Sequence, residues 1–301
     1  MADSVRDEVA EVHGLRLHYR DWGAPDSSAG DIVLAHGLSS TSHIWDLVAP
    51  RLAERYRVLA VDQRGHGESA QPDSGYDFPT IVGDLHGLIA VARVRLPALL
   101  VGHSWGASVV LRYAVDHPEA MAGVALVDGG IGSPGESWTW EETLARLTPP
   151  DIDGLPWVEM RERMLRSDPG LFAEPRVEAI LRSLYHVGPH GRVQRRLRIP
   201  NHLRILRALW EERPADLLAR VRCAVLVLPA RQPSELPERL EHKARQVARA
   251  KAVQPRVRVR WFEDTIHDVP LQRPDELAGE LSAFAAEVFA ETAPGVRLER
   301  R

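Results

Sequence analysis

Cysteine is nearly absent from this chain of 301 residues. The single cysteine, Cys223, has no partner within the chain, so a fold held by internal disulfides is excluded. The first residues lack the basic start and apolar run of a secretory leader. No stretch approaches the roughly 18 consecutive apolar residues of a membrane span. We therefore expect a cytoplasmic protein that does not enter a membrane.

The chain also lacks a large excess of positive or negative charge. The net charge is -4, and the 38 Lys and Arg residues, nearly all of them arginine, are spread along the chain. A nucleic-acid partner would favour a strongly basic face, so we expect none. Histidines and carboxylates are not clustered at the spacing of zinc ligands, and we predict neither a metal nor another cofactor. The sequence leaves the oligomeric state open, a homodimer included.

What is present is an ordinary composition for a globular enzyme, with 44% hydrophobic and 27% charged residues. Short apolar runs, typical of strands buried on both faces, alternate with stretches of helical spacing. This alternation predicts an α/β fold, with a mostly parallel twisted sheet and helices on both faces. After a hairpin over 9–19, we expect strands over 31–36, 57–62, 98–102, 121–128, 223–228 and 256–262, and helices over 42–55, 78–94, 105–116, 236–250 and 274–290.

The alternation stops between residue 129 and about residue 213. That segment has no convincing buried strand, many proline and glycine breaks, and Arg-rich amphipathic stretches. We predict that it forms an inserted helical cap. The expected division is a core over 1–129, the cap over 130–216, the second part of the core over 217–290 and a C-terminal tail over 291–301.

A candidate nucleophile, Ser104, lies in the sequence Gly-His-Ser-Trp-Gly between a predicted strand and a predicted helix. This context makes the short motif specific, because the tight turn requires small residues two positions before and after the serine. The turn lifts the serine to the carboxyl edge of the sheet, at the start of a helix. A helix N-terminus favours the negative charge that develops there. The alternative is a serine that only caps a helix.

Serine needs a base, usually histidine, to become a good nucleophile. Of the 13 histidines, His267 alone lies in the loop after the last predicted strand and before the last helix. It also satisfies the chain order serine, acid, histidine that is expected on such a sheet. We therefore predict that His267 is the base.

Two positions at the carboxyl edge of the sheet offer the third member, a carboxylate that orients the imidazole. Asp128 ends the strand before the insertion and is followed by two glycines, and Glu235 lies in the loop after the strand 223–228. Glu235 is equally suited to the first turn of a helix. We favour Asp128 and keep Glu235 as the alternative acid.

Acyl transfer also needs donors for a developing oxyanion. We predict the backbone N–H of Trp105, which directly follows the nucleophile, and that of Leu38, in the loop after His36 and Gly37. The alternative for His36 and Gly37 is a plain turn that ends a strand.

Together these motifs resemble the α/β-hydrolase superfamily, over about residues 9–289. The shared features are His36-Gly37, the loop Asp62-Gln-Arg-Gly-His-Gly-Glu-Ser69, the turn around Ser104 and a late histidine, and the chain looks like the capped esterase, lactonase and carbon–carbon hydrolase branch. In that branch the loop 62–69 is chiefly structural. Members usually carry an aspartate soon after the strand that matches 225–228, where this chain has Arg231, Gln232 and Pro233. A minority place the acid after the preceding strand, where Asp128 stands.

The resemblance implies a serine hydrolase that cleaves a carboxylic ester or lactone through an acyl-enzyme. A carbon–carbon hydrolase or a cofactor-free perhydrolase would use the same residues, and a ligand receptor with a vestigial triad is the alternative from another class. Epoxide- or halide-opening members would need an aspartate where Ser104 stands. An Arg-rich run over 192–207 is a candidate for binding a substrate carboxylate or, more simply, a solvated helix face. We expect a small apolar substrate to contact His36, Gly37, His103, Trp138, Trp157 and Trp210.

Overall fold

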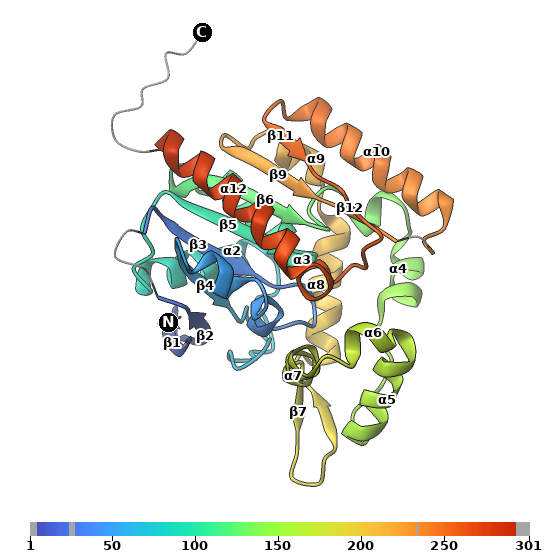
Figure 1. Cartoon of the computed structure of the whole chain (residues 1–301). Helices are drawn as coiled ribbons and strands as arrows, with labels where there is room; N and C mark the ends of the chain where they lie inside the picture. Colours follow the sequence, from blue (N-terminus) through green and yellow to red (C-terminus); the bar gives the residue numbers. More distant parts are fainter. Residues whose placement is uncertain (1–4, 24–27, 233, 293–301) are drawn as a thin grey trace.

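The computed structural model describes residues 5–23, 28–232 and 234–292. Its centre is an eight-stranded sheet, seen in Figure 1 with helices in front and behind. The two pairings that involve β2 are antiparallel, and the remaining pairings of the sheet are parallel. In sheet order, the strands are β1 (Arg6–Val12), β2 (Leu15–Asp21), β4 (Arg57–Val61), β3 (Asp31–Ala35), β5 (Ala98–His103), β6 (Met121–Val127), β9 (Ala224–Leu228) and β11 (Val257–Val259).

Side chains of the central strands alternate between two hydrophobic clusters, one on each face of the sheet. On β5, Ala98 and Leu100 join the first cluster, whereas Leu99 and Val101 join the second. The first cluster is covered by α2 (Phe78–Val91), α3 (Trp105–Asp116), α9 (Pro214–Leu218) and α10 (Pro237–Val253). The second is covered by α1 (Ala49–Leu52), α11 (Val269–Gln272) and α12 (Pro274–Thr292). Burial on both faces explains the continuous apolar runs of these strands.

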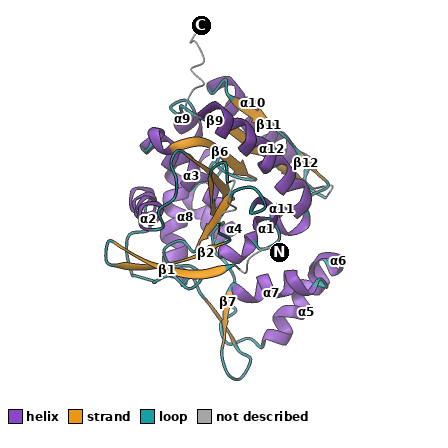
Figure 2. Ribbon diagram, turned by 60° about the vertical axis from the view of Figure 1, so that its left-hand side comes forward, coloured by secondary structure: helices purple, strands orange, loops and turns teal. Residues whose placement is uncertain are grey.

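Between β6 and β9 the chain leaves the sheet and forms mainly helices. These are α4 (Trp140–Leu147), α5 (Trp157–Ser167), α6 (Pro169–Phe172), α7 (Pro175–Ser183) and α8 (Ile199–Glu211), with a short hairpin of β7 (Tyr185–Val187) and β8 (Val193–Arg195). In Figures 1 and 2, α5, α6, α7 and the hairpin form an arm that projects from the rest of the molecule. The hairpin was not predicted, because its half-exposed strands lack a continuous apolar run.

The helix predicted over 42–55 is wrong. A 3-10 turn, Ser42–Trp45, is followed by the separate four-residue helix α1, which has Pro50 in its first turn. Proline has no N–H to donate, and its ring clashes with the carbonyl of the preceding turn. A helix that starts at Ser42 therefore cannot continue through this position. Two further 3-10 turns are Pro118–Ala120 and Pro134–Glu136.

The strand predicted over 256–262 is also interrupted. Its first part is β11, and its second part is β12 (Phe262–Glu263), which leaves the main sheet and pairs with β10 (Ala230–Arg231). This second ladder carries the chain toward the loop of His267. The last helix reaches Thr292, so residues 291 and 292 of the predicted tail are helical and the others lie outside the described residues.

Candidate functional site

The predicted triad residues lie at one edge of the sheet. Ser104 follows β5, Asp128 follows β6, and His267 lies between β12 and α11. Because β5 and β6 are neighbouring parallel strands in register from Gly102 and Leu126 to His103 and Val127, the residues after them emerge side by side. The interrupted strand and the β10–β12 ladder bring His267 to the same place.

Ser104 occupies a sharp turn between β5 and α3. Its backbone φ of 54° is positive, in a region that few residues other than glycine adopt, and its N–H donates to the carbonyl of Val127 at 2.9 Å. The serine is the N-cap of α3, although its hydroxyl makes no capping hydrogen bond. The hydroxyl is therefore left for another partner.

The two glycines of the motif are required by close backbone approach. A Cβ at Gly102 would lie 2.2 Å from the carbonyl oxygen of Gly106, and a Cβ at Gly106 would lie 2.4 Å from the carbonyl oxygen of Ala35. Both distances are far below contact. This turn can form only without side chains at 102 and 106, which is the reason that the sequence pattern is informative.

His267 contacts both other members of the predicted triad. Its Nε2 lies 2.9 Å from the Oγ of Ser104, and its Nδ1 lies 2.6 Å from the Oδ2 of Asp128. With Nδ1–H donating to the carboxylate, Nε2 is free to accept the serine proton. Desolvation opposes the charged imidazole, but the hydrogen bond to Asp128 and the charge of Asp128 raise the pKa of His267 above its ordinary value. The side chain is 53% exposed, so solvent reaches this edge.

Asp128 is the carboxylate that the structure brings to His267. Its side chain is 6% exposed, and its backbone φ of 41° is again positive. One oxygen faces His267, and the other accepts from the backbone N–H of Ala230 at 2.9 Å. Burial alone would raise the pKa of Asp128, but His267, Lys243 and the Ala230 N–H lower it to about 2. The alternative acid, Glu235, instead lies 3.7 Å from the ammonium of Lys243.

The predicted oxyanion loop passes next to the nucleophile. A Cβ at Gly37 would lie 3.0 Å from the Cβ of Ser104, so the residue before Leu38 is in close contact with the turn. Trp105 is the first residue of α3, where a backbone N–H has no partner within the helix. That the N–H groups of Leu38 and Trp105 act as the two donors stays a prediction.

Two buried histidines, His36 and His66, form hydrogen bonds with the loop that follows β3. His36, fully buried, accepts from the N–H of Gln63 and lies 2.7 Å through Nδ1 from the carbonyl of Gly37. His66 accepts from the N–H of Ser39 at 3.2 Å, and its ring stacks on Trp105 at 5.3 Å. Burial and the neighbouring His36 lower the pKa of His66 to about 3. A neutral imidazole can both accept and donate, which fits its position in the loop.

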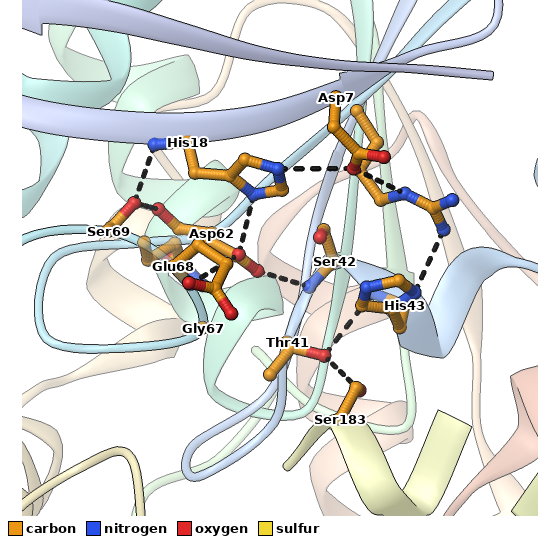
Figure 3. Close-up of polar contacts among 12 residues, drawn as sticks. Asp7, His18, Thr41, Ser42, His43, Asp62, Gly67, Glu68, Ser69 and Ser183 are labelled. Carbon is orange, nitrogen blue, oxygen red and sulfur yellow. Dashed lines mark hydrogen bonds and ion pairs between the residues drawn. The ribbon is translucent and has the colours of Figure 1, made fainter. Parts of the chain in front are cut away.

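A second buried network supports the segment that follows, as Figure 3 shows. The carboxylate of Asp62 binds Nδ1 of His18 at 2.7 Å and accepts from the backbone N–H groups of Ser42 and Glu68. The same figure shows the hydroxyl of Thr41 beside that of Ser183, at 2.9 Å, which joins the core to α7. These contacts agree with a structural role for the loop 62–69.

His103, which precedes the nucleophile, lies below the site. Its side chain is buried, and its Nε2 lies 2.9 Å from the backbone carbonyl of His267. Burial, together with the nearby His267, lowers the pKa of His103 to about 4, so it is neutral and donates this hydrogen bond near pH 7. His103 thus fixes the loop of the candidate base. The sequence analysis proposed it only as a substrate contact, and this hydrogen bond has no sequence signature.

The three tryptophans predicted to contact the substrate lie within the segment between β6 and β9. Trp157 packs with Ile152, Met160 and Val193 in a small separate cluster, and the Nε1 of Trp210 donates to the carbonyl of Trp138 at 2.8 Å. Substrate contacts by these tryptophans, by His36 and Gly37, and by His103 stay predictions.

A cavity of about 200 Å³ lies between the arm and the oxyanion loop. Its lining includes Ser39, Ile152, Met160, Leu184, Tyr185 and Leu197, and it is mainly apolar. Ser104 and His267 are not among its lining residues. A wider depression of about 910 Å³ opens beside it, and its lining includes Arg195, Arg196, Arg198, Asp151 and Asp153.

The described residues contain no group of three or more His, Cys, Asp and Glu side chains arranged to hold a metal ion. Among the described helices, none combines the length and the apolar composition needed to cross a bilayer.

Comparison with known proteins finds hydrolases of similar sequence. Epoxide hydrolase B of Mycobacterium tuberculosis (strain ATCC 25618 / H37Rv) is 35% identical over 136 residues, which are 42% of this chain and 38% of that protein. The 2-(acetamidomethylene)succinate hydrolase of Mesorhizobium japonicum (strain LMG 29417 / CECT 9101 / MAFF 303099) is 36% identical over 128 residues, 42% of this chain and 44% of that protein. The chain thus matches less than half of the length of these relatives.

The similarity of fold extends much further. The crystal structure of E-2-(acetamidomethylene)succinate hydrolase superposes with a TM-score of 0.77 over 93% of this chain and 99% of that chain, at 21% identity. The profile of the Alpha/beta hydrolase family matches residues 32–280. That range includes Ser104, Asp128 and His267, and the chain belongs to the α/β-hydrolase family.

Proposed function

We propose that this hydrolase cleaves a small carboxylic ester or lactone through a covalent acyl-enzyme on Ser104. The observation that carries the proposal is the continuous contact from Ser104 through His267 to Asp128, with distances of 2.9 and 2.6 Å. A hydroxyl, an imidazole and a buried carboxylate in this order are the parts that activate a serine for acyl transfer.

In the first step, Nε2 of His267 takes the proton of Ser104 as Oγ attacks the carbonyl carbon of the substrate. The carbonyl oxygen becomes an oxyanion, to which the N–H groups of Trp105 and Leu38 donate. Asp128 stabilises the imidazolium that forms. His267 then returns the proton to the departing alkoxide, which leaves an ester between Ser104 and the acyl group.

In the second step, His267 takes a proton from a water molecule that attacks the acyl-enzyme. The tetrahedral intermediate collapses, the proton returns to Oγ of Ser104, and the carboxylic acid is released. The 53% exposure of His267 supports this role, because solvent water must reach the imidazole. A lactone follows the same steps, with the alcohol and the acid released as one molecule.

Position 104 bears on the similarity to epoxide hydrolases. The family resemblance implies an aspartate nucleophile in the members that open epoxides, and this chain has Ser104. A serine paired with a histidine favours acyl transfer. The assembled contacts of His267 likewise argue against a receptor with a vestigial triad.

We also propose that residues 130–216 form the cap that selects the acyl group. The apolar cavity of about 200 Å³, with Ser39 of the oxyanion loop in its lining, supports a small apolar substituent on the substrate. A cavity of this size is comparable to one that holds a single aromatic ring, about 150 Å³.

The test is turnover of p-nitrophenyl esters and simple lactones of increasing acyl size, together with labelling by a fluorophosphonate. We expect short esters to be hydrolysed, and Ser104→Ala to lose roughly 10³-fold or more of the activity and all labelling. Ser74→Ala, in an exposed loop, is the matched control and keeps both. Labelling that persists in Ser104→Ala would disprove the nucleophile, and labelling without turnover of any ester or lactone would disprove the substrate class.

A further inference from the structure

Lysine is rare in this chain. Of the 38 basic residues only Lys243 and Lys251 are lysine, and both lie on α10. Lys251 is exposed on the last turn of that helix, whereas the side chain of Lys243 is 22% exposed and points to the candidate site. A chain that uses arginine nearly everywhere else thus has a lysine beside its predicted catalytic acid.

Three acceptors surround the ammonium of Lys243. Its Nζ lies 2.7 Å from the carbonyl oxygen of Ala230, 3.2 Å from Oδ1 of Asp128 and 3.7 Å from Oε1 of Glu235. An ammonium has three N–H groups on a compact centre, so one lysine can serve three converging acceptors. The guanidinium of arginine is planar and larger, and its fixed fork of N–H groups suits a planar acceptor better than three converging ones.

The contacts of Asp128 divide its two oxygens between two tasks. Oδ1 is held by the Ala230 N–H and by Lys243, and Oδ2 is held by His267. Lys243 also binds the carbonyl of Ala230, so that it fixes the backbone that presents the N–H. Rotation of the carboxylate would break all of these contacts, and the orientation that serves His267 is therefore maintained.

We propose that Lys243 is a positioning residue for the Ser104–His267–Asp128 array. Its ammonium holds the carboxylate of Asp128 toward His267, and its positive charge offsets part of the attraction between that carboxylate and the proton on the imidazole. This inference rests on the proposed role of His267 as the base. Glu235 opposes this effect, because its carboxylate offsets part of the positive charge of Lys243.

The charges that face His267 fix the direction of the effect. Asp128 and Asp268 raise the pKa of His267, Lys243 lowers it, and the neighbouring His103 is neutral near pH 7. Because the Ala230 N–H still holds Oδ1 of Asp128 in place, removal of the Lys243 charge raises the pKa of His267 further. Since the proton acceptor must be neutral, activity at slightly acidic pH then falls.

The experiment measures the titration of His267 by NMR in the full-length protein, with His267→Asn used to assign the signal. Lys243→Met removes the charge but keeps the length of the side chain, and Glu235→Gln removes the opposing charge. We expect His267 to titrate at a higher pH in Lys243→Met and at a lower pH in Glu235→Gln. Lys251→Met is the control from the same helix, and it leaves the titration unchanged.

A second readout is the rate of fluorophosphonate labelling against pH. For Lys243→Met, we expect the labelling rate at pH 6 to fall about 3- to 10-fold more than the labelling rate at pH 8.5. This is the size of effect that removal of one charge a few ångströms from the Asp128 carboxylate has on the ionisation of its partner. A residue that only stabilises the fold would lower the rate equally at every pH. Glu235→Gln should retain more of its plateau rate at pH 6 than the wild type does.

The outcomes separate this inference from the proposed function. An unchanged titration of His267 in both Lys243→Met and Glu235→Gln would overturn the inference, whether or not esters are hydrolysed. If Lys243→Met does not fold, the opposite shift in Glu235→Gln still decides the matter. Absence of labelling in the wild type would instead overturn the role of Ser104, and the NMR result would stand.

Discussion

At the scale of the residue, Asp128 shows how much a single carboxylate depends on its surroundings. It is buried at the end of β6, where the lost hydration disfavours its charge, and His267, Lys243 and a backbone N–H offset this cost. Glu235 lies nearby but is directed to Lys243. Proximity in the loop after β9 does not by itself make it an orienting group.

Exchange of each carboxylate for its amide should therefore separate the two acids. We expect Asp128→Asn to lower kcat by roughly 10²- to 10⁴-fold, because an amide neither fixes the required tautomer of His267 nor stabilises its charge. Glu235→Gln should stay within a few-fold of the wild type near pH 8. Ester turnover by the purified variants measures both effects, and a large loss confined to Glu235→Gln would show that Asp128 is not the acid.

The sequence was informative at these residues for physical reasons. Ser104 and Asp128 each follow a strand that is buried on both faces, and such strands are visible as apolar runs. His267 was indicated by its place between the last predicted strand and the last helix. The role of Lys243 left no such mark, because its acceptors come from elements far apart in the chain. The one sequence signal for Lys243 is that lysine is rare in this chain.

At the scale of the element, the turn between β5 and α3 depends on the absence of side chains at two positions. Gly102 and Gly106 pass each other with no space for a Cβ, whereas Gly83 in α2 has open space around the same position. The chain therefore contains glycines that are required by contact and glycines that are not. These two kinds should respond in opposite ways to the same substitution.

We expect Gly102→Ala to lower the free energy of unfolding by at least about 3 kcal/mol, because the turn must open to admit the methyl group. Gly83→Ala should raise it by about 0.5 to 1 kcal/mol, since alanine favours a helix interior. Urea denaturation followed by circular dichroism gives both values. Equal and small effects of the two substitutions would contradict the close packing described for the turn.

Elements were predicted well where one pattern extended along the whole segment, and poorly where a local break intervened. The helix expected over 42–55 failed at Pro50, although its apolar residues have helical spacing and do pack into the core. The strand expected over 256–262 failed because its end leaves the main sheet for β10. Pairing with a distant strand is a tertiary fact that periodicity does not contain.

At the scale of the whole molecule, the hydrophobic core is unequally divided. Two large clusters enclose the sheet, whereas the projecting part of the arm has a small cluster of its own around Ile152, Trp157, Met160 and Val193. The arm is tied to the rest by α7, whose Val177, Ile180 and Leu181 join the second large cluster, and by polar contacts such as Thr41 to Ser183. Polar contacts on this scale contribute about 1 kcal/mol each.

This division predicts that the part of the arm around the small cluster opens before the core unfolds. We expect the amides of α5 and β8 to exchange with deuterium through local opening, at a free energy several kcal/mol below that of β5 and β6. Native-state hydrogen exchange with mass spectrometry resolves these segments. Trp157→Ala, which removes the largest side chain of the small cluster, should accelerate exchange in α5 and β8 and leave β5 and β6 unchanged.

Equal protection of the arm and the central strands would mean that residues 130–216 fold as one unit with the core, which contradicts the proposed cap.

Selective opening has a consequence for catalysis. The lining of the cavity includes Ser39 of the predicted oxyanion loop, together with Ile152 and Met160 of the small cluster. Opening of the arm would therefore widen the cavity without disturbing Ser104, and Trp157→Ala should accept longer acyl chains while its rate of fluorophosphonate labelling stays that of the wild type.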